Sequence, residues 1–177
     1  MTPHQCSSET NEAVIRRVYA EIVNHGQFDL IDELYRPDVV DHDPFPGAPD
    51  GREGVRFTLG RLRQMYSDVE VTIEHLTAHD DKVTLRSTMR GTFARGLRGT
   101  PSTDRRVEYD AVVVFRLKDG LIAERWATLT IDRLLDQLGV DAADVRSSRI
   151  EVDVSGDKST SMLRALGELL TKSSAGT

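Results

Sequence analysis

Cysteine, positive charge and long apolar runs are all scarce in this chain of 177 residues. The single cysteine, Cys6, cannot form a disulfide within the chain, which fits a reducing compartment. The formal net charge of −6 argues against nucleic acid or an anionic membrane as the partner, because both attract basic surfaces. No stretch approaches the ~20 apolar residues of a membrane-spanning helix, and the opening residues do not resemble a signal peptide. We therefore expect a soluble, cytoplasmic protein.

Motifs for metal or cofactor chemistry are also missing from the sequence. His4, His75 and His79 do not stand at metal-ligand spacing from any cluster of carboxylates. There is no glycine-rich phosphate loop, no nucleophile elbow and no cysteine–histidine pair. Any reaction is therefore expected to proceed without a cofactor or metal, by proton transfer between side chains.

Apolar residues in the first part of the chain recur at helical spacing. They predict a helix from Thr10 that ends at Gly26, a shorter helix over 28–35, and a third helix from Gly51 to about residue 67. A short strand is expected to begin at Val39, between the second and third helices. Residues 1–9 are expected to be a flexible start.

Beyond Asp68 the apolar period changes from helical to alternating, which is typical of strands. The predicted strands cover 69–74, 83–89, 107–117 and 121–129, a glycine-containing loop covers 94–104, and a short helix covers 132–138. This order predicts an α+β domain over 10–140, with helices on one face of an antiparallel sheet. Residues 141–177 form a polar extension, in which 160–172 can be a short amphipathic helix over the pocket, part of a dimer contact, or a segment of a mobile tail.

The segment from Val39 to Gly47 carries the strongest chemical signal. Asp43 follows a strand and precedes Pro44, and the prolines at 44 and 46 restrict the backbone around it. Burial at the mouth of a pocket would raise the pKa of such a carboxyl and make it useful as an acid or base. The same residues are also ordinary in a surface turn. His42 alternates away from Asp43 and can be either a substrate contact or an exposed turn residue.

Three further residues are candidates. Tyr19 lies on the apolar stripe of the first helix and is therefore buried, as a hydrogen-bond donor or as a core residue. Asp110 interrupts the most apolar strand, where a buried carboxylate would have to be paired or protonated. Strand parity also allows it to point outward beside Glu108. Arg125 is expected to face the cavity, where it could hold a carboxylate or carbonyl.

The chain resembles the SnoaL-like polyketide cyclases, a branch of the cone-shaped superfamily that includes nuclear transport factor 2, ketosteroid isomerase and limonene epoxide hydrolase. The resemblance covers about residues 10–140. It implies a strongly curved antiparallel sheet around a deep pocket, closed by the N-terminal helices. It rests on the following segments: Tyr35-Arg36-Pro37-Asp38, His42-Asp43-Pro44, Gly51-Arg52-Glu53-Gly54, Thr103-Asp104-Arg105-Arg106, the stretch from Asp119 to Trp126, and Leu134-Leu135-Asp136-Gln137-Leu138-Gly139.

The resemblance also bears on the reaction. Cyclases of this family carry an aspartate directly after the motif written here as Glu124-Arg125-Trp126, and this chain has Ala127 there. The usual acid/base of aldol ring closure is therefore absent. Ketosteroid isomerase places its base at the position of Asp43, with a tyrosine donor at the position of Tyr19.

These observations lead to one expected function and two alternatives. We expect a cofactor-free acid/base enzyme that acts on a polyketide intermediate, free or carrier-bound, and closes an oxygen heterocycle such as a pyran. Asp43, Asp110 and Tyr19 are the expected catalytic residues, and His42 and Arg125 the expected substrate contacts. The alternatives are a double-bond isomerase or epoxide-opening cyclase, and a non-catalytic binding or dimerisation module. Apolar residues on both faces of strands 107–117 and 121–129 predict a homodimer.

Overall fold

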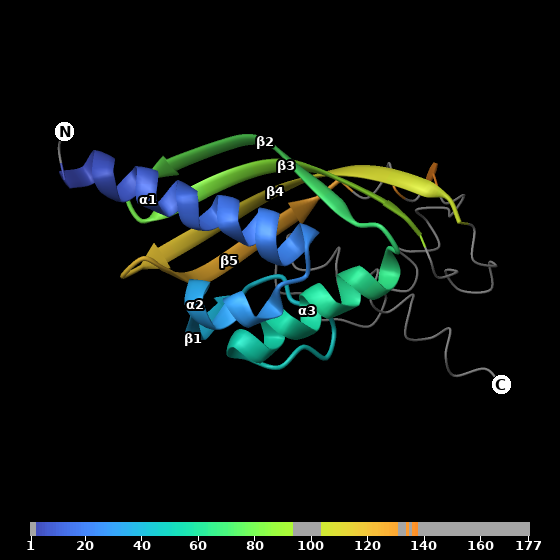
Figure 1. Ribbon diagram of the computed structural model, residues 1–177, viewed down its shortest axis with the longest axis horizontal. Helices are drawn as coiled ribbons and strands as arrows, with labels where there is room; N and C mark the ends of the chain where they lie inside the picture. The colour runs from blue at the N-terminus through green and yellow to red at the C-terminus, as the bar shows by residue number, and fades with distance from the viewer. Residues whose placement is uncertain (1–2, 94–103, 131–133, 135, 138–177) are drawn as a thin grey trace, which may run out of the picture.

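The computed structural model describes residues 3–93, 104–130, 134, 136 and 137. A five-stranded curved sheet carries the helices on one side (Figure 1). This is the α+β arrangement that the sequence predicts. The expected extension over 141–177 and nearly all of the expected loop over 94–104 lie outside the described residues.

The N-terminal helix is longer than predicted and changes type along its length. Helix α1 covers Pro3–Arg17 and continues as a π-helical segment, η1, over Val18–Asn24. It therefore begins inside the stretch expected to be flexible. Gly26 follows with a φ of +73°, the left-handed conformation that ends the helix.

The second predicted helix is divided into two short pieces. A 3-10 turn, η2, covers Phe28–Leu30, and helix α2 covers Ile31–Leu34. Helix α3 covers Gly51–Met65, close to its predicted range.

The sheet has the strand order β1-β5-β4-β3-β2. Its strands are β1 (Tyr35–Asp41), β2 (Glu70–His79), β3 (Lys82–Thr92), β4 (Arg106–Lys118) and β5 (Leu121–Leu129). Neighbouring strands are antiparallel except at one edge, where β1 runs parallel to β5. The wholly antiparallel sheet expected from the sequence is thus corrected at β1. Pro37 is tolerated there because it lies in an edge strand, where the register with β5 is irregular.

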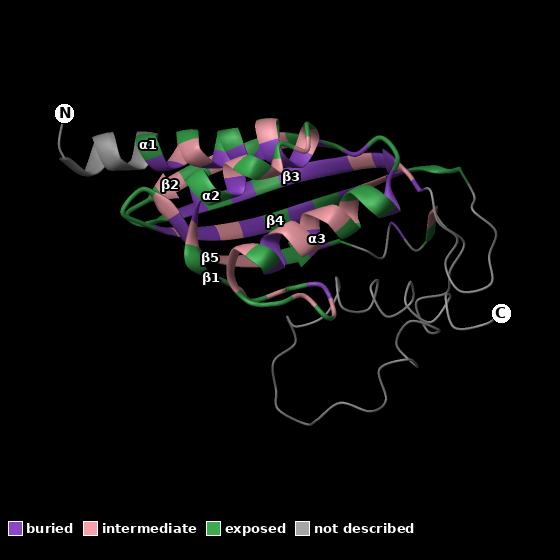
Figure 2. Cartoon of the chain, turned by 60° about the horizontal axis from the view of Figure 1, so that its bottom comes forward, coloured by how far each residue is buried: buried purple, intermediate pink, exposed green. Residues whose placement is uncertain are grey.

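Buried residues alternate with exposed and intermediate ones along β4 (Figure 2). On β4, the side chains on the helix side are all buried: Val107, Tyr109, Ala111, Val113, Phe115 and Leu117. We call this side the inner face. The opposite side, the outer face, carries exposed Asp110 and Val112 on the same strand. Alternation along the strand produces this division.

Two polar contacts fix the helical segments against the sheet. The Asn24 amide donates to the Val71 carbonyl and accepts the Val71 N–H, at 3.0 and 2.8 Å, and so ties the end of η1 to β2. The Arg52 guanidinium donates from Nε and Nη2 to the Tyr35 carbonyl, at 2.8 and 2.6 Å. Arg52 thereby holds the start of β1 against α3. Tyr19 and Tyr35, which belong to these anchored segments, both reach the cavity described below.

No helix within the described residues is long and apolar enough to cross a membrane.

Candidate functional site

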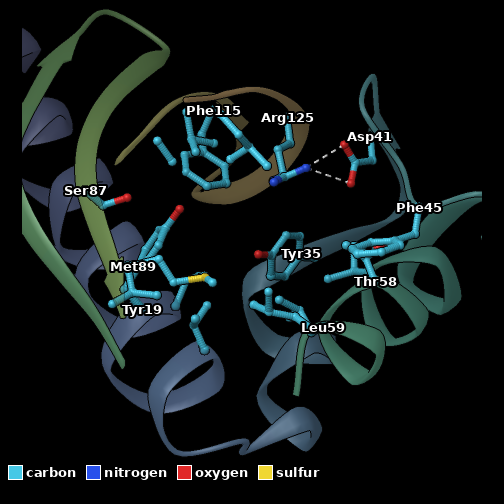
Figure 3. Close-up of a pocket in the computed structure, with 18 of the residues that line it drawn as sticks. Tyr19, Tyr35, Asp41, Phe45, Thr58, Leu59, Ser87, Met89, Phe115 and Arg125 are labelled. Carbon is cyan, nitrogen blue, oxygen red and sulfur yellow. Dashed lines mark hydrogen bonds and ion pairs between the residues drawn. The ribbon is translucent and has the colours of Figure 1, made fainter. Parts of the chain in front are cut away.

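A cavity of about 790 Å³, including its open mouth, lies between the helices and the inner face of the sheet. Figure 3 shows its walls, which are mostly apolar with a few polar groups between them. The lining residues that carry a polar group are Tyr19, Tyr35, Asp41, Thr58, Ser87, Tyr109 and Arg125.

An ion pair occupies one side of this cavity. Arg125 donates from a single nitrogen, Nη1, to both carboxylate oxygens of Asp41, at 2.8 and 3.0 Å. The parallel pairing of β1 with β5 places these two residues opposite each other in register. Both side chains are largely buried, and the Arg125 Nε and Nη2 groups have no hydrogen-bond partner among the described residues. The guanidinium therefore retains donors for a ligand in the cavity.

Tyr19 and Tyr35 lie in the same cavity as Arg125 (Figure 3). Burial raises the pKa of Tyr19 to about 12, an effect that the positive charge of Arg125 partly offsets. Burial likewise raises the pKa of Tyr35. Both phenols thus stay protonated at neutral pH and can donate a hydrogen bond. Neither hydroxyl has a partner among the described residues.

Asp43 lies just beyond the end of β1 and does not line the cavity. Its Oδ2 accepts the Ala127 N–H at 2.7 Å, and its own N–H donates to Asp41 Oδ1 at 3.1 Å. Burial raises the pKa of the Asp43 carboxyl, against the opposing effects of the Ala127 hydrogen bond and of Arg125. Asp43 is therefore a partly buried carboxyl next to the ion pair, outside the cavity wall.

Two of the candidate residues lie away from the cavity, on the outer face. The catalytic role expected for Asp110 is wrong, because of the two orientations that strand parity left open the structure has the outward one. The side chain is exposed and accepts a hydrogen bond from Thr88 at 3.0 Å. No β-bulge interrupts the pairing of β4 with β3 near Asp110, so regular strand alternation directs this side chain to the outer face. His42 stacks on Trp126 with ring centroids 4.4 Å apart, and its Nε2 lies 2.9 Å from Glu124. Trp126 thus packs on an imidazole on the outer face of the sheet.

The structure adds Asp41, Tyr35, Thr58 and Ser87 to the residues that the sequence singled out. Thr58 lies at the centre of the cavity face of α3, between Val55 and Leu59, and its hydroxyl has no partner in the described chain. A polar residue within an otherwise apolar stripe was the available signal for Thr58 and for Ser87. Tyr35 gave no such signal because it was expected to end a helix. Asp41 gave none because its contact with Arg125 depends on the pairing of β1 with β5.

The described residues contain no group of three or more histidine, cysteine, aspartate or glutamate side chains that could hold a metal ion.

Comparison with known proteins assigns the fold to a family. The family model for SnoaL-like polyketide cyclases matches residues 13–138. No curated protein matches the chain.

Solved structures agree with the family match. IdmH from Streptomyces antibioticus, described as a candidate polyketide cyclase, shares 30% sequence identity over 73% of this chain and 99% of its own, with a TM-score of 0.66. A candidate polyketide cyclase from Bacillus cereus ATCC 10987 shares 28% identity over 75% of this chain and 83% of its own, with a TM-score of 0.64. TsrD from Streptomyces laurentii shares 26% identity over 75% and 97%, with a TM-score of 0.67. On the match over residues 13–138 and this structural likeness, the chain belongs to the SnoaL-like polyketide cyclase family.

Proposed function

We propose that the protein is a cofactor-free acid/base enzyme that closes an oxygen ring on a polyketide-type intermediate. The reaction is the loss of water from a β-hydroxy carbonyl compound, followed by addition of a remote hydroxyl to the resulting enone. The Arg125–Asp41 pair, inside a cavity with mostly apolar walls, is the observation that carries this proposal.

The charged pair and its phenol neighbours suit a carbonyl whose oxygen gains negative charge during the reaction. The remaining N–H groups of Arg125 and the hydroxyls of Tyr19 and Tyr35 are preorganised donors in a cavity with mostly apolar walls. Such donors stabilise an enolate oxygen more than a neutral carbonyl, which lowers the barrier to enolate formation. Among the described residues, Asp41 is the one carboxylate that lines the cavity, so it is the group proposed to move protons.

The proton transfers balance with one carboxylate. In the elimination, Asp41 takes the α-proton and delivers it to the departing hydroxide, so that water leaves and the enone remains. In the ring closure, the substrate hydroxyl forms a bond to the β-carbon and gives its proton to Asp41, which returns it to the α-carbon. Asp43 lies beside Asp41, and its raised pKa lets it exchange protons between this carboxylate and solvent.

The test uses a linear enone thioester of N-acetylcysteamine whose hydroxyl can close a six-membered ring. Turnover is measured as loss of enone absorbance and as formation of a single enantiomer of the cyclic ether. We expect Asp41→Asn and Tyr19→Phe each to lower kcat/KM, the former by about 10²-fold or more. Asp110→Asn is the matched control, because its side chain is exposed on the outer face. Wild-type turnover by Asp41→Asn, or a racemic product, would contradict the proposal.

A non-catalytic binding module is the second candidate. Ala127 stands where the family's cyclases carry an aspartate, and Asp110 faces away from the cavity. This candidate predicts that the enone binds without turnover and that Asp41→Asn changes affinity only. Hydroxy-epoxide and β,γ-enone substrates in the same assay test the epoxide-opening and isomerase alternatives, since the same donors and carboxylate would serve both reactions.

A further inference from the structure

Ser87 interrupts the apolar stripe on the inner face of β3. Its neighbours on that face, two residues away in each direction, are Leu85 and Met89. The residue is 1% exposed and lines the cavity, and Figure 3 shows its hydroxyl pointing into that space. No side chain or backbone group of the described chain hydrogen-bonds to this hydroxyl. Ser87 is therefore a buried polar group whose hydrogen-bonding capacity the protein does not use.

A ligand that fills the cavity would change the surroundings of this hydroxyl. Water is displaced as the ligand enters, and an apolar ligand would leave the Ser87 hydroxyl buried without a partner. An unpaired buried hydroxyl is destabilising, whereas a ligand oxygen placed beside it restores a hydrogen bond. The cavity wall thus favours a ligand with an oxygen at this point over a ligand of the same shape without one.

We propose that Ser87 is a second anchoring point, which binds a neutral oxygen of the substrate remote from the reacting carbonyl. Ser87 pairs with Ala111 on β4, and Ala111 pairs with Leu129 on β5. Arg125 lies four residues before Leu129 on that strand. Two strand spacings and four residues place the Cα atoms of Ser87 and Arg125 about 16 Å apart. The bound substrate is therefore an extended chain with oxygen functions at both ends of the cavity.

The chemistry at Ser87 selects a hydroxyl or ketone over a carboxylate. Its neighbours in the cavity wall, Met89 and Ala111, are uncharged, and the nearest described cation in the cavity, Arg125, is already paired with Asp41. An ionised group at Ser87 would lose hydration without gaining an opposite charge. This inference rests on the proposed function only for the placement of the carbonyl near Arg125.

The experiment measures binding without turnover, by titration calorimetry. The probes are decan-2-one, which has no hydroxyl, and the four hydroxydecan-2-ones that carry one hydroxyl on carbon 6, 7, 8 or 9. We expect one hydroxyketone to bind wild-type protein about 10-fold more tightly than decan-2-one. Ser87→Ala should remove this advantage. It should bind decan-2-one at least as tightly as the wild type does, because this ligand then no longer buries an unpaired hydroxyl. Alanine is no larger than serine and removes an unpaired hydroxyl, so the variant should keep the wild-type Tm.

A second variant, in which the hydroxyl is moved to the neighbouring strand, tests whether the preferred ligand changes with the position of the hydroxyl. The double variant Ser87→Ala/Ala111→Ser moves the hydroxyl one strand closer to β5 along the same rung. It should regain a preference for a hydroxyketone, now for an isomer with the hydroxyl nearer the carbonyl. If Ser87 is present only because a small residue is needed there, Ser87→Ala keeps the wild-type preference, and the proposal is overturned.

The two proposals fail separately. If decan-2-one binding depends on Arg125 but no isomer gains from Ser87, the second anchor is wrong and the carbonyl site stands. If the Ser87-dependent preference is found but the enone thioester is not turned over, the second anchor stands and the proposed reaction is wrong.

Discussion

The carboxylate of Asp43 accepts the backbone N–H of Ala127 at 2.7 Å, across 84 residues of sequence. The preceding rung of this edge is a backbone bond, from His42 N–H to the Arg125 carbonyl at 2.9 Å. The Asp43 side chain thus continues the β1–β5 pairing after the strand itself has ended. It also brings a carboxylate to the backbone of position 127, where the resemblance to the family's cyclases implies an aspartate side chain.

This arrangement predicts how stability depends on pH. The folded protein raises the pKa of Asp43 above its ordinary 3.8, chiefly by burial. The stability linked to this group is therefore complete below pH ~4 and is lost as the pH rises through the folded-state pKa. An asparagine side chain in its place resembles the neutral acid and can still accept the Ala127 N–H through its amide oxygen. We expect Asp43→Asn to raise Tm at pH 7 and to leave it unchanged at pH 3.

Thermal melts across this pH range check the prediction, with Asp110→Asn as the exposed control. A lower Tm for Asp43→Asn at pH 7 would show that the charged carboxylate contributes more through its hydrogen bond than it loses by burial.

The buried pair of Asp41 and Arg125 predicts a non-additive stability effect. Arg125→Met leaves the Asp41 carboxylate without its partner, which should cost about 3–5 kcal/mol of unfolding free energy. The double variant Asp41→Leu/Arg125→Met removes both charges and should recover most of this loss. Urea denaturation of the wild type, both single variants and the double variant measures the coupling. Additive losses would show that the two charges do not stabilise each other in the folded protein.

Thr58 offers a stabilising substitution. Thr58 is 7% exposed, and its Oγ1 has no hydrogen-bond partner in the described chain. Valine has the same shape and the same branched Cβ, so Thr58→Val removes an unsatisfied hydroxyl without changing the packing volume. We expect a gain of about 1 kcal/mol, seen as a rise in Tm of about 2–4 °C. Thr84→Val, at an exposed position of β3, should change Tm by less than this. An unchanged or lower Tm for Thr58→Val would count against an unsatisfied hydroxyl.

Strand alternation allowed part of the site to be predicted from the sequence. Arg125 shares parity with Ala127, and the unbroken pairing of β5 with β4 at these positions keeps both on the inner face. The same rule places Asp110 on the outer face with Val112. Asp110 lies in an apolar strand, which suggested that it is buried. The sequence alone does not show which of the two alternating sets of side chains faces the helices, so it could not settle the orientation of Asp110.

The pairing of β1 could not be inferred from local sequence. Asp41 and Arg125 are 84 positions apart and meet because β1 runs parallel to β5 at the sheet edge. Local periodicity predicts that a segment is a strand but not which distant strand it joins. The expectation of a wholly antiparallel sheet therefore gave no role to Asp41. The two prolines that follow Asp43, at 44 and 46, indicated Asp43 instead.

The outer face of the sheet predicts a homodimer. Val40 and Val112 are 48% and 44% exposed there, and the stacked rings of His42 and Trp126 are on the same face. Apolar side chains grouped on a sheet face are usually covered, and a second copy related by two-fold symmetry would bury the same patch on both chains. Charged pairs on the same face, such as Arg116 with Glu124, would then fix the orientation of the two subunits.

Sedimentation at micromolar concentration should therefore give twice the chain mass of 19.8 kDa. Val112→Arg places a charge on this face, where pairing would bring two like charges together, and should weaken dimerisation by at least ~10-fold. Gln64→Arg, on the exposed side of α3, adds the same charge away from the sheet and should leave the dimer intact. A wild-type protein that sediments as a monomer would rule out this interface, and a Val112→Arg dimer of unchanged affinity would place the interface elsewhere.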